Sequence, residues 1–276
     1  MDIVDSQVHL NRIGIEAGIA AMDALGIQST VVDEYDGPDD EGWHKPYLLL
    51  ANGVKRPIAP VARAAAERYP TRLCYVLRLE HLDPELEAVV ADVKSSPGGR
   101  GLRICVNTPE KIDAFVRGEF DAIFAIAASY DLPLFVLLPA CSHLLQPYAE
   151  RFPATKMVVD HCGVLRTPEN IEQQILPLGR FPNVALKWSH ARYSFPSPSY
   201  PFREIGPYLR RAADAFGAER ILWGSDSTAN RTGCSWAETL FQVWDCTEIS
   251  SDEKTWILGR SARRLLDWSL PDAASA

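Results

Sequence analysis

The chain has 276 residues, of which 47% are hydrophobic and 23% charged, and its formal net charge is −8. This length suits one α/β barrel of about 250 residues, and the acidic balance argues against a nucleic-acid partner, which needs clustered Lys and Arg. Since no stretch of about 18 uninterrupted apolar residues could span a bilayer, no membrane partner is expected either.

Eight short apolar runs alternate with longer helical patterns, which is typical of β-α units repeated around a parallel sheet. The predicted strands lie at residues 2–8, 29–34, 72–79, 100–106, 133–138, 156–160, 183–188 and 220–224. The predicted helices lie near residues 58–69, 84–95, 115–130, 142–151, 169–178, 204–216 and 235–245, and further helices follow at 250–268. Because the strand count reaches eight, we expect a single (β/α)8 TIM barrel with extra C-terminal helices, one domain spanning residues 1–276, and not an open Rossmann-like sheet.

The interval after the second strand, residues 34–55, is long and rich in Asp, Gly and Pro. It is predicted to be an active-site loop. The aromatic and Pro-rich segment 189–203 suits either a pocket wall or a subunit contact, so a homo-oligomer stays open.

Polar side chains follow three of the predicted strands at their carboxyl ends. The segments are Asp5-Ser6-Gln7-Val8-His9, Val158-Val159-Asp160-His161-Cys162-Gly163 and Leu222-Trp223-Gly224-Ser225-Asp226. In an α/β barrel these ends share one mouth, so we expect His9, His161 and Asp226 to meet there. Strand alternation predicts that Asp160 points away from His161 and has a structural role.

These segments, together with Gly101-Leu102-Arg103, Leu186-Lys187-Trp188-Ser189 and the chain length, resemble the amidohydrolase-2 family. The resemblance covers nearly the whole chain and implies a barrel enzyme, since the family includes lactonases, decarboxylases and hydratases. Its members typically carry His-x-His after strand 1, one His after each of strands 5 and 6, and an Asp after strand 8. The resemblance places His9, His161 and Asp226 in three of these five positions.

The chain departs from the family pattern at two metal-ligand positions. Gln7 stands where the first His of His-x-His is usual, and the strand-5 run ends Leu137-Leu138-Pro139-Ala140-Cys141, with His143 several residues late. A neutral amide is a poor zinc ligand compared with imidazole. Two states therefore stay open: a single divalent ion, zinc or manganese, held by His9, His161 and Asp226, or no metal, with the same groups acting directly. No Gly-rich phosphate loop follows a strand, so a nucleotide cofactor is not expected.

The reaction that we predict is hydrolysis of a carboxylate-bearing lactone or similar ester, a small-molecule substrate. Asp226 would act as general base on water, and His161 and His9 would polarise the carbonyl oxygen. One alternative is a metal-dependent non-oxidative decarboxylase, and another is a binding barrel that has lost turnover. Asp226→Asn should abolish hydrolysis while leaving ligand binding largely intact. If wild type and variant bind equally and neither turns over any lactone, the binding alternative is favoured.

A substrate carboxylate calls for a guanidinium, whose planar fork matches two carboxylate oxygens. Arg103 is the first candidate, followed by Arg78, Lys187 and Arg231, and Gln7 is a further substrate-binding candidate. Arg103 could instead neutralise a buried acid within the barrel.

Three further residues lie in segments that reach the mouth. His44 and His190 follow strands 2 and 7, where a solvated loop histidine is the usual case, and Trp43 could cap a substrate. The six cysteines are widely spread, without a Cys-x-x-Cys pair. The predicted strand begins at residue 2, without the basic region and apolar core of a signal peptide. Reduced thiols and a cytoplasmic location are therefore expected.

Overall fold

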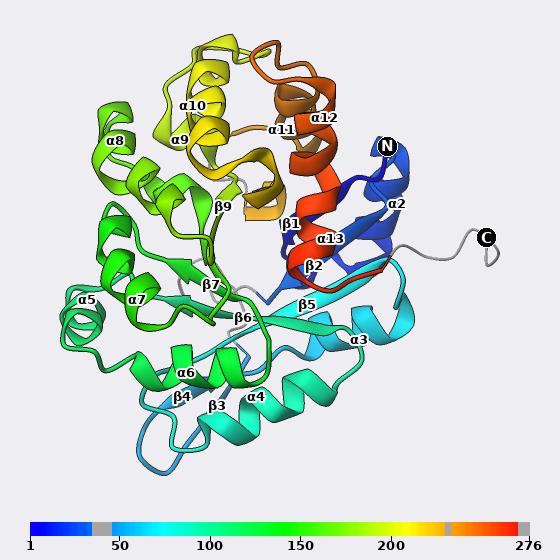
Figure 1. The fold of residues 1–276 in the computed structure, drawn as a ribbon. Helices are drawn as coiled ribbons and strands as arrows, with labels where there is room; N and C mark the ends of the chain where they lie inside the picture. The colour runs from blue at the N-terminus through cyan, green and yellow to red at the C-terminus, as the bar shows by residue number, and fades with distance from the viewer. Residues whose placement is uncertain (35–45, 230–232, 270–276) are drawn as a thin grey trace.

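A computed structural model describes residues 1–34, 46–229 and 233–269 and contains all eight predicted barrel strands (Figure 1). Neighbouring strands pair in parallel and follow one another around the sheet in chain order. The barrel strands are β1 (Val4–Val8), β2 (Ser29–Asp33), β5 (Leu73–Arg78), β6 (Gly99–Cys105), β7 (Leu134–Leu137), β8 (Met157–Val159), β9 (Val184–Trp188) and β10 (Ile221–Trp223).

The barrel is nearly closed where β10 meets β1. The backbone N–H of Asp226 donates to the carbonyl of Gln7 at 3.0 Å, and the N–H of Ser225 donates to the Asp5 carboxylate at 2.9 Å. These bonds join β1 to the segment that follows β10, the last barrel strand. The predicted TIM-barrel architecture is thereby confirmed.

Helices connect the strands on the outside of the barrel (Figure 1). They are α1 (Leu10–Ile13), α2 (Ile15–Leu25), α3 (Pro60–Arg68), α4 (Leu86–Ser95), α5 (Pro109–Val116), α6 (Asp121–Ser129), α7 (Gln146–Arg151), α8 (Ile171–Gln174), α9 (Ala191–Ser194), α10 (Gly206–Phe216), α11 (Trp236–Trp244), α12 (Ser251–Thr255) and α13 (Ser261–Leu265). Helices α1 and α2 were not predicted. The helix predicted at 115–130 is two helices, since Gly118 has φ +82° between them. The predicted C-terminal helices are confirmed as α12 and α13.

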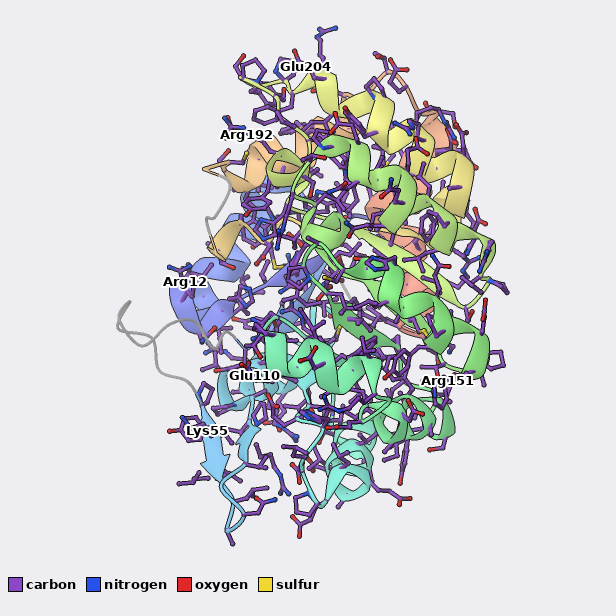
Figure 2. The ribbon with its side chains drawn as sticks, turned by 90° about the vertical axis from the view of Figure 1, so that its left-hand side faces the viewer. Arg12, Lys55, Glu110, Arg151, Arg192 and Glu204 are labelled. Atoms are coloured by element: carbon purple, nitrogen blue, oxygen red, sulfur yellow. The ribbon has the colours of Figure 1, made fainter. Side chains whose placement is uncertain are left out.

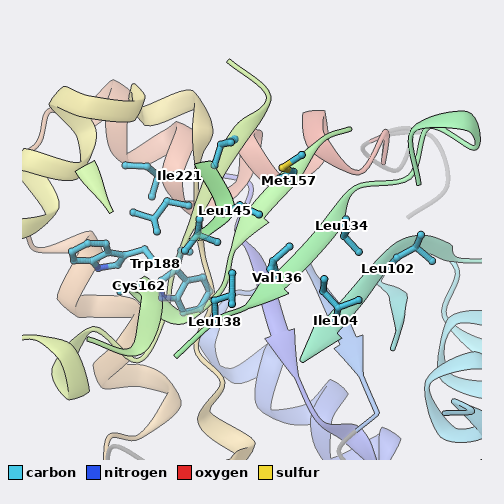
Figure 3. Close-up of a cluster of buried hydrophobic side chains, with 14 of the residues drawn as sticks. Leu102, Ile104, Leu134, Val136, Leu138, Leu145, Met157, Cys162, Trp188 and Ile221 are labelled. Carbon is cyan, nitrogen blue, oxygen red and sulfur yellow. The ribbon is translucent and has the colours of Figure 1, made fainter. Parts of the chain in front are cut away.

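The core forms two layers separated by the sheet. Outward-facing side chains such as Leu134, Val136 and Met157 pack toward the helices (Figure 3). Inward-facing side chains such as Val158 and Leu222 fill the barrel together with Ala262, Leu266 and Trp268 from the C-terminal segment. Because apolar residues lie on both faces of most barrel strands, runs such as Leu134–Leu137 show no polar alternation.

A two-stranded hairpin lies within the interval predicted as a loop. Strands β3 (Tyr47–Leu49) and β4 (Lys55–Pro57) pair in antiparallel fashion and extend from the barrel (Figures 1 and 2). Gly53, with φ +84°, makes the turn, and Asn52-Gly53 is a hairpin signal that the sequence interpretation missed. Residues 35–45, including Trp43 and His44, lie outside the described residues. Among the described residues, no helix is long and apolar enough to cross a membrane.

Candidate active site

His9, His161 and Asp226 meet at the carboxyl end of the barrel, although 217 positions separate the first and last of them. The Nε2 atom of His9 lies 2.8 Å from Oδ1 of Asp226, and the Nε2 atom of His161 lies 3.7 Å from Oδ2. All three residues are buried, with 1%, 5% and 4% of their surfaces exposed. Their proximity agrees with the expected geometry, while their roles stay predictions.

His190 joins this group, whereas the sequence interpretation favoured a solvated loop position over entry into the mouth. Its Nε2 atom lies 2.5 Å from Oδ2 of Asp226, and its ring packs edge-on against His161 with centroids 4.6 Å apart. A signal existed in the sequence: His190 follows the end of β9 closely, much as His161 follows β8.

Three of these residues share an unusual backbone conformation. His161, His190 and Asp226 have φ values of 52°, 52° and 46°, in the left-handed region that non-glycine residues rarely adopt. Such a residue costs on the order of 1–3 kcal/mol and is concentrated at functional sites. Each left-handed residue turns the chain out of its strand, so that its side chain no longer follows the strand alternation.

The prediction that Asp160 points away from His161 is wrong, because both side chains contact the guanidinium of Arg103, while its structural role stays a prediction. Asp160 follows Val158 by two positions, and both side chains point into the barrel. The Asp160 carboxylate contacts Nε of Arg103 and Nζ of Lys187, both at 2.7 Å. The alternation argument failed because the left-handed conformation at His161 brings its side chain to the same mouth.

Asp33, at the end of β2, is a second buried acid that the sequence interpretation missed. Its carboxylate accepts from Nε and Nη2 of Arg78 at 2.9 and 2.6 Å, from Nε2 of Gln7 at 3.1 Å, and from Nη1 of Arg103. The amide oxygen of Gln7 in turn accepts from Nζ of Lys187 at 2.5 Å. Gln7 thus connects Asp33 with Lys187 through its neutral amide.

The predicted carboxylate-binding residues differ in access. Arg103 and Lys187 neutralise buried acids, and their side chains are only 3% and 1% exposed. The contacts of Arg103 with Asp33 and Asp160 match the alternative considered above, in which Arg103 neutralises a buried acid within the barrel. The Arg78 side chain is 10% exposed, which leaves it the most accessible of the three. Arg231 lies outside the described residues.

Burial and neighbouring charges shift the pKa values of the acids and of His161 in this cluster. Burial raises the pKa values of Asp33 and Asp160, but the neighbouring cations outweigh it and lower both below their usual range. Burial also lowers the pKa of His161 well below its usual value, which favours the neutral imidazole.

The contacts of His161 indicate which nitrogen carries the proton. Its Nδ1 lies 2.8 Å from Oγ of Ser189, and its Nε2 lies 2.9 Å from Nη2 of Arg103. A guanidinium can only donate, so Nε2 accepts and Nδ1 holds the proton. In this tautomer His161 directs no N–H toward Arg103, and its predicted role in polarising the carbonyl oxygen stays a prediction.

One group of described residues could hold a metal ion. His161, His190 and Asp226 each offer a ligand atom, and these atoms lie within 4.8 Å of one another. Two imidazoles and one carboxylate fit zinc in donor type. The set contains His190 in place of the expected His9. Candidate donor atoms in this set already contact protein groups, since Nε2 of His161 contacts Arg103 and Nε2 of His190 contacts Oδ2 of Asp226.

A family model described as Amidohydrolase matches residues 4–268, nearly the whole chain. The chain belongs to the amidohydrolase family. This assignment agrees with the resemblance inferred from the three strand-end motifs and with the barrel that places them together.

Individual members of the amidohydrolase family are more distant. An L-fucono-1,5-lactonase from Burkholderia ambifaria is 26% identical over 206 residues, which cover 67% of this chain and 68% of that protein. A zinc-bound amidohydrolase structure from Burkholderia multivorans has a TM-score of 0.75 at 20% identity, covering 98% and 100% of the two chains. A Pseudomonas putida structure, described as a candidate 2-pyrone-4,6-dicarboxylic acid hydrolase, has a TM-score of 0.71 at 18% identity, covering 98% and 99%.

Proposed function

We propose that this chain is a hydrolase that opens a lactone ring, with Asp226 as general base. The observation that carries the proposal is the environment of Asp226: its carboxylate is buried at the mouth, with Oδ2 2.5 Å from Nε2 of His190 and Oδ1 2.8 Å from Nε2 of His9. Burial raises the pKa of Asp226, but His9 and His190 outweigh it and hold the pKa well below its usual range. The carboxylate is therefore ionised and can take a proton. The similarity to an L-fucono-1,5-lactonase supports the choice of a lactone.

The reaction begins when a water molecule attacks the lactone carbonyl carbon and gives its proton to the carboxylate of Asp226. As the new C–O bond forms, the carbonyl electrons move onto oxygen, where the cationic guanidinium of Arg103 stabilises the charge. The ring C–O bond then breaks, and the leaving alkoxide takes the proton from Asp226. The product is a hydroxy acid, and Asp226 is again ionised.

Metal chemistry is compatible with the donor set but is not needed for these steps. If an ion were bound, His161, His190 and Asp226 would hold it, and it would supply Lewis-acid polarisation of the carbonyl. The proposal assigns that polarisation to Arg103, whose guanidinium contacts Nε2 of His161 at the mouth.

Removal of metal should therefore leave lactone hydrolysis intact. We expect protein dialysed against a strong chelator to hold well below one zinc or manganese per chain by elemental mass spectrometry. Its kcat should match that of untreated protein, because the base and the hydrogen-bond donors belong to the chain. Loss of activity on chelation, with recovery on adding zinc, would contradict this expectation and favour an ion at His161, His190 and Asp226.

We further propose that the lactone carries a carboxylate and that Arg78 contacts it. Arg78 is the most accessible of the three described cations, and Asp33 fixes its guanidinium with two hydrogen bonds. A hydrogen bond to a charged group contributes about 1.5–3 kcal/mol, or roughly a 10- to 100-fold change in affinity.

The two probes for this proposal are 2-pyrone-4,6-dicarboxylate, which is anionic, and L-fucono-1,5-lactone, which is neutral. In Arg78→Met we expect the KM for the anionic probe to rise about 10-fold or more, with little change for the neutral probe. Arg117→Met is the matched control, because Arg117 is an exposed arginine that pairs with the exposed Glu119. Equal effects of Arg78→Met on both probes would refute selective carboxylate binding, and turnover of neither probe by wild type would count against the lactonase proposal.

A further inference from the structure

Each nitrogen of the Arg103 guanidinium contacts a different buried group. Nε donates to Asp160 at 2.7 Å, and Nη1 donates to Asp33. Nη2 lies 2.9 Å from Nε2 of His161, which is one of the three residues that could hold a metal ion. Because the two acids fix the planar guanidinium from one side, its third nitrogen is directed at this imidazole.

The contact with Arg103 uses the one lone pair that His161 could offer to a metal ion. A neutral imidazole has a single such lone pair, because its other ring nitrogen carries the proton. In His161 the proton is on Nδ1, which lies 2.8 Å from Oγ of Ser189, so Nε2 is the atom that would bind an ion. Since Nε2 instead accepts from Nη2 of Arg103, metal binding by His161 would require Arg103 to move away from it.

The buried charges around this group of three residues also oppose a divalent ion. Asp226 is the only carboxylate of the group. The nearby cations Arg78, Arg103 and Lys187 outnumber their two acid partners by one charge, and Asp226 balances that charge. Because ligation requires neutral imidazoles, a bound divalent ion would leave two positive charges without a buried partner. Unpaired buried charge is strongly destabilising.

We propose that Arg103 excludes divalent metal ions from the group formed by His161, His190 and Asp226, and that its guanidinium supplies the positive charge there instead. This inference deepens the proposed function and rests on it for the catalytic use of that charge. Movement of Arg103 away from His161 would also break its contacts with Asp33 and Asp160. Arg103 therefore determines whether the same three side chains form a metal site.

The experiment measures zinc binding to chelator-treated protein by isothermal titration calorimetry. Arg103→Met removes both the positive charge and the contact with His161, and it leaves two cations for the two buried acids. We expect this variant to bind one zinc per chain with a Kd at least about 100-fold lower than that of wild type. Arg117→Met, at an exposed pair with Glu119, is the matched control and should bind zinc as wild type does.

Arg103→Lys provides the same test in a protein that keeps a positive charge beside both acids, in case Arg103→Met does not fold. The shorter side chain lacks the nitrogen that contacts His161, so the lone pair of Nε2 becomes available. Loss of one hydrogen bond from a charged group corresponds to roughly 10- to 100-fold in affinity. We therefore expect the zinc Kd of Arg103→Lys to be about 10-fold lower than that of wild type.

Double variants test whether the gained zinc lies at the proposed position. Arg103→Met combined with His190→Ala should lose the gained affinity. Arg103→Met combined with His143→Ala should keep it, because His143 is exposed on the turn at Ser142–Leu145. A gain that survives the loss of His190 would place the zinc elsewhere and would overturn the inference.

Two further results would overturn the inference. One is a wild type that binds one zinc as tightly as Arg103→Met does, and the other is zinc binding by folded Arg103→Met and Arg103→Lys that is no tighter than that of wild type. Zinc binding is measured without substrate. Failure of wild type to turn over either lactone probe would therefore count against the proposed function alone, so the two failures are distinguishable.

Discussion

Asp226→Asn should reduce lactone hydrolysis by about 10²- to 10⁴-fold, the usual contribution of a general base. The asparagine has nearly the same shape, and its amide oxygen can still accept from His190. It cannot take a proton from water at neutral pH, so the loss should fall on kcat. The measurement is steady-state hydrolysis of both lactone probes, with substrate binding followed separately by calorimetry.

The control for this change is Asp252→Asn, which removes an equal charge from an exposed position on α12. It should leave kcat and KM as in wild type. Near wild-type kcat in Asp226→Asn would contradict the role of Asp226 as base. If wild type and Asp226→Asn bind a probe equally and neither turns it over, the chain is a binding barrel.

Asp160→Ala should lower the free energy of unfolding by about 3–5 kcal/mol at pH 7, the usual loss when one partner of a buried ion pair is removed. The change would leave Arg103 and Lys187 buried with one carboxylate fewer. The Lys187 ammonium is the more affected of the two, since burial already lowers its pKa and Asp160 is its ion-pair partner. The measurement is urea unfolding followed by circular dichroism.

The sign of the pH dependence provides a second test of Asp160. Its pKa is lowered by folding, so its contribution to stability is fully present above the unfolded value, about 3.9, and declines as the pH falls below it. The difference between wild type and Asp160→Ala should therefore be constant from pH 6 to 8 and should narrow in acid. Glu119→Gln, at an exposed pair with Arg117, should unfold as wild type does. An unfolding free energy of Asp160→Ala within about 1 kcal/mol of wild type would show that the buried cations do not depend on this carboxylate.

The interior of this barrel contains a layer of charged side chains that are almost entirely buried. Three cations, Arg78, Arg103 and Lys187, alternate with Asp33 and Asp160 below the mouth. Each cation contacts at least one of these acids. Three positive and two negative charges leave the layer with one net positive charge. Asp226, above this layer, supplies the remaining negative charge, which is consistent with its ionised state in the proposed mechanism.

The strands and the barrel were predictable because they depend on local pattern. Eight β-branched runs with no polar alternation indicate strands buried on both faces, and only a barrel covers eight such strands in chain order. The strand-end motifs then placed His9, His161 and Asp226 at one mouth, since all carboxyl ends of parallel strands share it. The hairpin at residues 47–57 was missed although Asn52-Gly53 signals its turn.

The sequence by itself determined the strands, their order and the three histidine and aspartate positions that open onto the mouth. The tertiary structure alone decided the rest, for two physical reasons. A strand that is apolar on both faces does not reveal which face is the interior, so the inward direction of Asp160 was not readable. The contacts of Asp33 with Arg78 and Arg103, and of His190 with Asp226, join residues from different strands, and they exist only once the sheet has curved into a barrel and left-handed residues have turned the chain at the strand ends.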